Sequence, residues 1–420
     1  MSESTTAQSG IKAGTEAPSY SMLAFLWLGI IAVAYATNAA DRQIFPTLLP
    51  AIRAEFGWDL SQAGFLSTAF TLGLALIGIP AGLVVDRVAR KPTIVVSMIL
   101  YSAFTLATNY ATGFWDMLVF RVLTGVGEGM QMAAAFAIIG SYFYDRRTFY
   151  LGWLTMAYGV GSFIGPRIAA WMHAAAVDWR NPFVWFAIAG FVLAMLVLIA
   201  LPRIFTESRG PKTGAVVDEA SYRHVPDTLI NRNVVMGMIA SAVNGLVMFG
   251  FLSLYAVYLR EELKFAGADV GATLSFVGLG GFLSFYGGYI GDRIGNRWIV
   301  IGSFTTLAIV AYPIFNGVTS VGMQSFLTLI VGACASAFTY INLLSHLQRS
   351  VRPDKVGTAS GMFLAAMFGA GAAAGYLMGW LIEKYGWSTA TTIQLSLLPF
   401  VGVIAMLLVN PNQLLSAKRR

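Results

Sequence analysis

GLVVDRVARKPTIV (residues 82–95) and GYIGDRIGNRWIVI (residues 288–301) are two copies of one loop, and this repeat decides the fold. The copies match at a constant offset of 206 residues, close to half of a 420-residue chain. The matching positions are Gly82, Asp86, Arg87 and Lys91 in the first copy and Gly288, Asp292, Arg293 and Arg297 in the second. A repeat of this length predicts a chain built from two homologous halves.

Both halves consist mainly of apolar stretches. Hydrophobic residues make up 57% of the chain, charged residues 11%, and the mean hydropathy is +0.69, which places the chain among membrane proteins. A transmembrane helix needs about 20 mostly apolar residues. The sequence predicts twelve such helices, at residues 23–49, 61–85, 94–110, 116–142, 151–174, 182–202, 234–258, 268–290, 298–317, 323–347, 357–382 and 388–409.

The polar segments divide these helices into domains. We expect an N-terminal unit of six helices at residues 23–202 and a C-terminal unit of six at residues 234–409. The charged segment between them, residues 203–233, has the composition of an exposed linker. Residues 1–22 and 410–420 are expected to be tails, and the first of them lacks the pattern of a signal peptide.

Lysine and arginine positions predict the orientation, because cytoplasmic loops collect them. With the N-terminus inside, nineteen of these residues fall in cytoplasmic segments and five outside, the latter being Arg53, Arg180, Arg260, Lys264 and Lys384. Both termini are therefore predicted to be cytoplasmic, in the inner (plasma) membrane of a cell. The same asymmetry explains the net charge of +7 without a nucleic-acid partner.

The sequence offers little that would suggest an enzyme or a cofactor. The single cysteine, Cys334, excludes an intramolecular disulfide, and His173, His224 and His346 lie in different segments, which argues against a metal site. The glycine-rich GVGEGM (residues 125–130) lies inside a predicted span and is not a nucleotide-binding loop. We therefore expect neither enzymatic activity, nor ATP-driven transport, nor a cofactor.

Charged residues inside the predicted spans are few, and each costs roughly 2.5–3.5 kcal/mol at a helix centre. Away from the ends of the spans, all belong to the N-terminal half: Asp41, Arg42, Arg121, Glu128 and Arg167. Such residues are candidates for function, and Arg167 is instead expected to anchor its helix near the membrane surface.

Asp41 and Arg42 are neighbours in NAADRQIFP (residues 38–46). One interpretation is a mutually neutralised pair that only fixes helix packing. The other is a proton site, because burial favours a protonated carboxyl group whereas Arg42 favours the ionised form of Asp41. Glu128 has no neighbouring base in the sequence, so it is either a second proton site or a neutral acid that hydrogen-bonds between helices.

The repeated loop resembles the signature of the major facilitator superfamily, and the resemblance covers residues 20 to 410. It implies two six-helix bundles around a central cavity and transport by alternating access. It also implies a cytoplasmic gate formed by Gly82, Asp86, Arg87, Arg90, Lys91, Gly288, Asp292, Arg293 and Arg297. The first copy departs from the family pattern at Ala89, where a glycine is usual.

Asp41 and Arg42, together with RVLTGVGEG (residues 121–129), resemble the anion/cation symporter branch of this superfamily. The resemblance implies that Asp41 and Glu128 carry protons and that Arg42 and Arg121 bind the substrate anion or pair with the acids. The same residues also resemble the spinster-like lipid transporters, so both branches stay open.

Six further polar residues lie within apolar spans and are predicted to contact the substrate. Contacts between helices are the alternative for each of them. They are Asn38, Tyr35, Tyr158, Asn244, Tyr340 and Asn342.

Together these features predict a proton-coupled secondary transporter of a small organic anion, a carboxylate or a sugar acid, working by symport as a monomer in the bilayer. The alternatives are a spinster-like lysolipid or lipid transporter, a drug/proton antiporter, which GSFIGP (residues 161–166) favours weakly, and a receptor or scaffold that does not transport.

Overall fold

The computed structural model describes residues 21–143, 147–176, 178–207, 224–352 and 355–414. Every regular element within these ranges is a helix, as predicted. The N-terminal half contains α1 (Met22–Phe56), α2 (Leu60–Arg87), α3 (Arg90–Thr108), α4 (Phe114–Tyr142), α5 (Arg147–Ala176) and α6 (Arg180–Ala200). The short α7 (Arg203–Thr206) follows at the start of the linker.

The C-terminal half is less regular, because several of its long helices contain π-helical turns, labelled η. It contains α8 (Arg232–Val257), η3 (Tyr258–Glu262), α9 (Gly267–Gly281), α10 (Ser284–Ile294), α11 (Asn296–Phe315), α12 (Val321–Gly332), η4 (Ala333–Tyr340), α13 (Ile341–Arg349), α14 (Val356–Thr391), η6 (Thr392–Leu397) and α15 (Leu398–Leu407), with a final 3-10 turn, η7 (Pro411–Gln413).

Nine helices in the described ranges are long and apolar enough to cross a membrane. Three features account for the difference from the twelve predicted spans. Thr358–Leu407 is counted as one helix, although Gly386 (φ 78°, ψ 167°) interrupts it where we expected a loop. The helices α9 and α10 are each too short to cross a membrane. The helix α5 is not among those that are both long and apolar enough. The number of spans and the location of the termini therefore stay predictions. Each predicted span lies mainly in helix, although a turn at residues 282–283 interrupts the span predicted at 268–290.

Local sequence explains how the first two helices begin and end. The Ser21 hydroxyl accepts a hydrogen bond from the Ala24 amide at the start of α1, and Gly57 ends the helix in the left-handed conformation (φ 66°). Asp59 and Gln62 then form a capping box at the start of α2. The three residues 57–59 thus make a tight turn between antiparallel helices.

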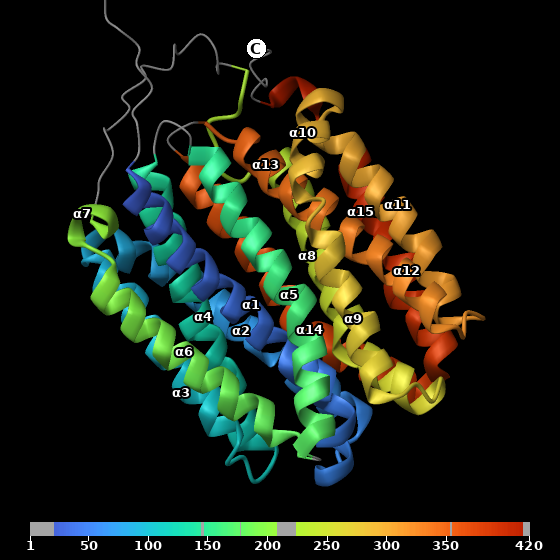
Figure 1. Ribbon diagram of the computed structural model, residues 1–420. Coiled ribbons are helices and arrows are strands. Elements are labelled where there is room, and N and C mark those ends of the chain that lie inside the picture. The colour runs from blue at the N-terminus through green and yellow to red at the C-terminus, as the bar shows by residue number, and fades with distance from the viewer. Residues whose placement is uncertain (1–20, 144–146, 177, 208–223, 353–354, 415–420) are drawn as a thin grey trace, which may run out of the picture.

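The two halves lie side by side, with the described chain beginning and ending on one side, at the top of Figure 1. We call this the termini side and the opposite one the far side. Between the halves, α2 packs along α14, α5 along α9 and α1 against α8.

Glycines permit the close approach of the halves. A Cβ atom on Gly64 of α2 would overlap the Gly375 carbonyl of α14, and one on Gly379 would overlap the Leu60 carbonyl. The Thr68 hydroxyl also donates to the Ala372 carbonyl at 2.9 Å. Gly375 and Gly379 of α14 are therefore packing residues.

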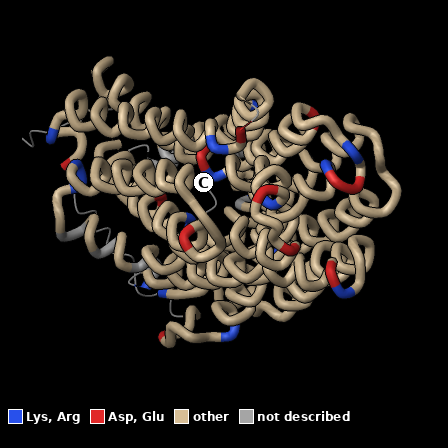
Figure 2. Tube along the Cα trace, turned by 90° about the horizontal axis from the view of Figure 1, so that it is seen from below, with Lys and Arg blue, Asp and Glu red and all other residues tan. Residues whose placement is uncertain are grey.

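Polar contacts join the halves on the far side. Both terminal oxygens of Glu261 accept from Nη1 of Arg53, at 2.8 and 2.7 Å. Glu383 accepts from the Ser61 amide at 2.9 Å and from its hydroxyl at 2.7 Å. Figure 2, which views this side, shows acidic and basic positions next to one another on the helix ends. In this conformation the halves are joined on the far side.

Gly375→Val should loosen this junction, because the new side chain would collide with the α2 backbone. Overpacking costs about 1–3 kcal/mol, which should raise the population opened on the far side about tenfold or more. The measurement is the labelling rate of a cysteine at Ser67, in a Cys334→Ser background, by an impermeant maleimide. Gly369→Val on the same helix is the control, because nothing lies within 4 Å of a Cβ added there. Equal rates for the two variants would contradict the role of Gly375.

Glu207, just after α7, caps α3 from the linker. Its carboxylate accepts from the amides of Arg90 (3.0 Å) and Lys91 (2.9 Å), and Ala89 supplies no side-chain cap of its own. Partial burial opposes ionisation, but these two backbone hydrogen bonds outweigh it and lower the pKa of Glu207. The start of the linker is thereby tied to the loop between α2 and α3.

Glu207→Gln should lower the unfolding temperature in detergent at pH 7, because losing a helix cap costs about 1 kcal/mol. A folded-state pKa below the ordinary glutamate value of about 4.3 means that the ionised group stabilises the fold above that pH. The difference from the wild type should shrink as the pH falls below about 4. The exposed Glu262 offers a control through Glu262→Gln. A pH-independent difference would rule out the charge as its cause.

Candidate functional site

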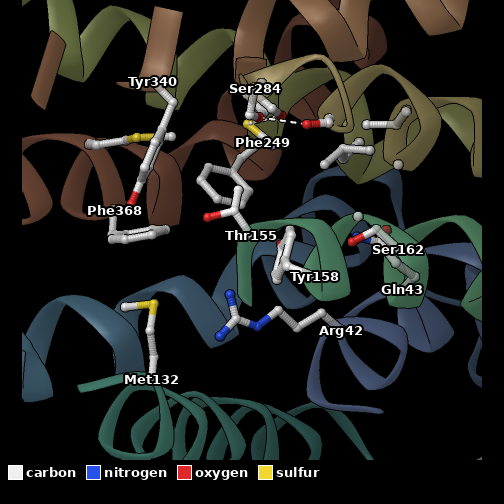
Figure 3. A pocket seen from close by; sticks show the side chains of 18 of the residues that line it. Arg42, Gln43, Met132, Thr155, Tyr158, Ser162, Phe249, Ser284, Tyr340 and Phe368 are labelled. Carbon is white, nitrogen blue, oxygen red and sulfur yellow. Dashed lines mark hydrogen bonds between the residues drawn. The ribbon is translucent and has the colours of Figure 1, made fainter. Parts of the chain in front are cut away.

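A cavity of about 320 Å³ lies between the two halves. It is lined mainly by apolar and aromatic side chains from α1, α2, α4, α5, α8, α9, η4, α13 and α14, with Ser284 contributed by α10. Figure 3 shows Arg42, Met132 and Tyr158 on one wall, with Ser284, Tyr340 and Phe368 opposite. Among the described lining residues Arg42 carries the one formal charge.

Arg42 connects this cavity to a buried charge cluster. Its Nε atom donates to Oε2 of Glu128, on α4, at 2.5 Å, and the side chains are 6% and 1% exposed. The guanidinium also lies 5.6 Å from the centre of the Tyr158 ring. Nη2 of Arg42 and Oε1 of Glu128 have no hydrogen-bond partner, so both groups retain capacity for a ligand, water or proton.

Asp41 faces a different helix. Its Oδ2 atom accepts from the Thr105 hydroxyl on α3 at 2.8 Å, and Oδ1 has no partner. Adjacent residues on a helix point about 100° apart, and here Asp41 and Arg42 hydrogen-bond to residues on different helices, α3 and α4. Of the two interpretations, the mutually neutralised Asp41–Arg42 pair is not the arrangement found in this conformation: the ion-pair partner of Arg42 is Glu128, which has no neighbouring base in the sequence.

Arg121 lies in the interior of the cluster and is 2% exposed. Its guanidinium is 4.8 Å from the centre of the Phe45 ring and 5.3 Å from that of Phe70, and it interacts electrostatically with both Asp41 and Glu128. Nε and Nη2 have no hydrogen-bond partner. Arg121 does not line the cavity, so in this conformation its charge compensates the two acids and is not presented to the cavity.

Asn38 and Gln131 fix α1 against α4 beside this cluster. The Asn38 amide donates to Oε1 of Gln131 at 2.7 Å, and Gln131 donates to the Ala34 carbonyl at 3.2 Å. All three groups are buried. Asn38 thus holds the helix that carries Asp41 and Arg42 and does not line the cavity.

The other polar residues predicted to contact a substrate separate into two groups. Tyr35, Tyr158 and Tyr340 line the cavity. Asn244 instead donates to the Ala335 carbonyl at 3.3 Å, and Asn342 donates to the carbonyls of Gly287 (3.0 Å) and Phe338 (2.8 Å). In this conformation these two asparagines and Asn38 make contacts between helices and do not line the cavity, so their contact with a substrate stays a prediction.

The predicted gate residues lie toward the termini side. The side chains of Gly82, Asp86, Arg87 and Asp292 are outside the described part of the structure. Among the others, Arg90 and Lys91 bind Glu207 through their amides, Arg293 stacks on Tyr289 at 4.3 Å, and Arg297 donates to the Leu407 carbonyl at 2.9 Å. Gly288 is near Ile341, without a close approach. The gate stays a prediction.

Several lining residues were missed by sequence reasoning because they are small or uncharged. Gln43, Ser67 and Ser162 place polar groups at the cavity, and the hydroxyls of Ser67 and Ser162 have no partner. Thr105 and Gln131 were missed in the cluster. Their signal was a polar residue in an apolar helix, which is too common to single out a site.

Two helical halves with a cavity between them and buried charges in one half define a membrane transporter. The family model described as Major Facilitator Superfamily matches residues 31–376. The chain belongs to that superfamily and is a multi-pass transporter rather than an enzyme.

Individual relatives are distant. The chain is 25% identical over 393 residues to the 4-hydroxybenzoate transporter PcaK of Acinetobacter baylyi, covering 86% of this chain and 85% of that protein. It is 23% identical over 394 residues to the hexuronate transporter of Bacillus subtilis, covering 89% and 92%. A bacterial homologue of the lysosomal transporter Spinster, solved in an inward-facing, unoccupied conformation, aligns with a TM-score of 0.71 at 18% identity, covering 93% and 96%. The last similarity shows the fold alone.

Arg42→Gln should destabilise the protein, because it leaves Glu128 buried without its cation; breaking such a pair costs about 3–5 kcal/mol. The loss should grow with rising pH, since Glu128 can avoid the penalty only by binding a proton. Adding Glu128→Gln should recover most of the stability. Thermal unfolding of both single variants and the double variant measures the coupling. Additive losses would show that the 2.5 Å pair contributes nothing to stability.

Proposed function

We propose that this protein is a proton-coupled symporter of a small organic anion, and that its substrate is an aromatic monocarboxylate. The observation that carries the proposal is Arg42, which lines the cavity and at the same time pairs with the buried Glu128. Among the described lining residues, Arg42 is the cation available to an anion that enters the cavity, and its guanidinium is already paired with the carboxylate of Glu128, which the anion can displace.

The lining favours an aromatic acid over a sugar acid. A hexuronate has hydroxyl groups around its ring, and each buried hydroxyl without a partner is costly. Rings, thioethers and aliphatic side chains make up most of this lining, among them Phe70, Phe136, Phe249, Phe368 and Met132, and the uncharged polar groups beside them are single hydroxyls and one amide. Similarity to a 4-hydroxybenzoate transporter supports the same choice, and the volume of about 320 Å³ suits one small ring better than a lysolipid.

Competition for Arg42 provides the coupling. When the substrate carboxylate binds the guanidinium, Glu128 loses hydrogen bonding and charge compensation, and a buried anion in that position is stabilised by binding a proton. Asp41, held by Thr105 and near Arg121, is the second proton site. Release of the substrate reverses these steps, and Glu128 pairs with Arg42 again.

Charge balance separates two versions of this cycle. One proton with one monovalent anion makes transport electroneutral. Two protons, on Asp41 and Glu128, import one net positive charge, worth about 2.3 kcal/mol per 100 mV. Both versions use alternating access between the halves, with both termini cytoplasmic, in the inner membrane.

Accumulation in proteoliposomes tests the proposal. With the membrane potential clamped at zero, a gradient of one pH unit supports about tenfold accumulation for one proton and about a hundredfold for two, since each proton contributes about 1.4 kcal/mol. Glu128→Gln and Asp41→Asn should each reduce proton-driven uptake of 4-hydroxybenzoate, while exchange of internal for external substrate continues. Exchange needs no net proton movement.

Two controls make this result interpretable. Protein-free liposomes measure passive entry of the neutral acid, and Asp269→Asn removes a carboxylate in the first turn of α9, away from the charge cluster. Undiminished proton-driven accumulation by both Glu128→Gln and Asp41→Asn would refute the coupling assignment.

A further inference from the structure

The wall of the cavity opposite Arg42 carries hydroxyl and thioether groups but no charge. In the described C-terminal half the polar lining residues are Ser253 on α8, Ser284 on α10, and Ser336 and Tyr340 on η4. Met248 and Met367 complete this wall with sulfur atoms. A substrate held by its carboxylate at Arg42 therefore presents its other end to neutral groups.

Most hydroxyl hydrogens on this wall are already engaged. Ser253 donates to the Gly250 carbonyl at 2.8 Å and Ser284 to the Gly281 carbonyl at 2.5 Å. Ser336 contacts the Met248 sulfur at 3.9 Å, a weak acceptor. Among the described residues none forms a hydrogen bond with the Tyr340 hydroxyl. Tyr340 is thus the hydroxyl of this wall with both its donor and its acceptor capacity open.

The Tyr340 ring is held in place and directed into the cavity. It packs edge-on against Phe363 of α14, with ring centres 4.9 Å apart. Figure 3 shows its hydroxyl end pointing into the cavity, from the wall opposite Arg42. Tyr340 is also the last residue of η4, and π-helical turns often occur at functional sites.

We propose that Tyr340 is a specificity-determining residue that contacts the end of the substrate distal to its carboxylate and selects the substituent there. It favours a neutral substituent able to hydrogen-bond, such as a hydroxyl, and the uncharged wall around it rejects a second carboxylate. This inference rests on the proposed function and adds to it a rule of selection: one charge at Arg42 and a neutral polar group at Tyr340.

The physical reason is an asymmetry in cost. A ring hydroxyl that meets Tyr340 exchanges one hydrogen bond with water for one with protein. A carboxylate in the same position would lose its hydration without finding a cation, because the described lining residues offer only Arg42. Discrimination against a dianion should therefore exceed discrimination between neutral substituents.

Competition binding to purified full-length protein tests this rule at constant pH, without a proton gradient. Labelled benzoate is displaced by unlabelled benzoate, 4-hydroxybenzoate or terephthalate, which are probes with hydrogen, hydroxyl or carboxylate at the distal position. We expect the wild type to prefer 4-hydroxybenzoate over benzoate about tenfold and to bind terephthalate at least about a hundredfold more weakly than benzoate.

Two variants of Tyr340 then separate the two parts of the rule. Tyr340→Phe should bring the ratio for 4-hydroxybenzoate over benzoate close to one and leave benzoate affinity within about twofold, since the ring is kept. Tyr340→Lys should raise terephthalate affinity relative to benzoate about tenfold or more, by supplying the missing cation. The control is Tyr312→Phe on the outer surface of α11, where the tyrosine is 52% exposed.

Each result decides something. A preference that survives in Tyr340→Phe, or a wild type that binds terephthalate as well as benzoate, overturns the specificity role while leaving the proposed function in place. A folded wild type that binds none of the aromatic acids overturns both proposals. Loss of all binding in Tyr340→Phe alone also overturns the rule, because it would make Tyr340 essential for the whole ligand and not for its distal end.

Discussion

The ion pair between Arg42 on α1 and Glu128 on α4 is the interaction on which the rest of the site depends. Two ions lose nearly all their hydration here, and the cost is tolerable only while they face each other at 2.5 Å. The pair still leaves one guanidinium nitrogen and one carboxylate oxygen without partners. The pair is thus stable, and its two unpartnered atoms leave room for a ligand or a proton to bind and compete with the ion pair.

Charge neutrality extends this argument to the whole cluster. Two arginines and two acids sum to zero when all are ionised, and they occupy one half of the protein. A further anion makes the sum negative inside a low-dielectric environment, so its binding favours uptake of a proton at Glu128 or Asp41. Linkage requires the converse, that protonation strengthens anion binding. In the proposed cycle, symport therefore follows from electrostatics and needs no separate coupling device.

The fold was predictable from the sequence to a large extent, because apolar length and the repeated loop at residues 82–95 and 288–301 are properties of the chain itself. Breaks such as Gly386 and the π-helical η4 were not, since they depend on packing against neighbouring helices. In the candidate site, the four charged residues that the structure brings into one buried cluster had been selected from the sequence by their rarity in apolar spans.

Pairing within the site was not predictable, because adjacency along a helix does not give adjacency in space. Arg42 pairs with Glu128, 86 residues away in the sequence, and Asp41 accepts a hydrogen bond from Thr105 on a third helix. The contacts of the asparagines were open for a related reason: an amide in an apolar helix indicates a polar contact, but the sequence does not say whether the contact is a ligand or another helix. Tyr340 and Asn342 are two residues apart, and only the first reaches the cavity.

Segregation of charge also bears on how the halves could move. The described C-terminal lining carries no charge, so in the proposed cycle it can shift against the N-terminal half without separating ions in a dry environment. Among the described residues, Arg53 and Glu261 form an ionic contact between the halves at the far side, where their side chains are 25% and 40% exposed and water can replace the lost partner. The pair that would be expensive to break, Arg42 with Glu128, lies within one half, and in the proposed cycle the substrate itself disturbs it. Opening of the far side and binding of the anion would then depend on different interactions, so that the protein could stay closed on the far side and still respond to an anion in the cavity.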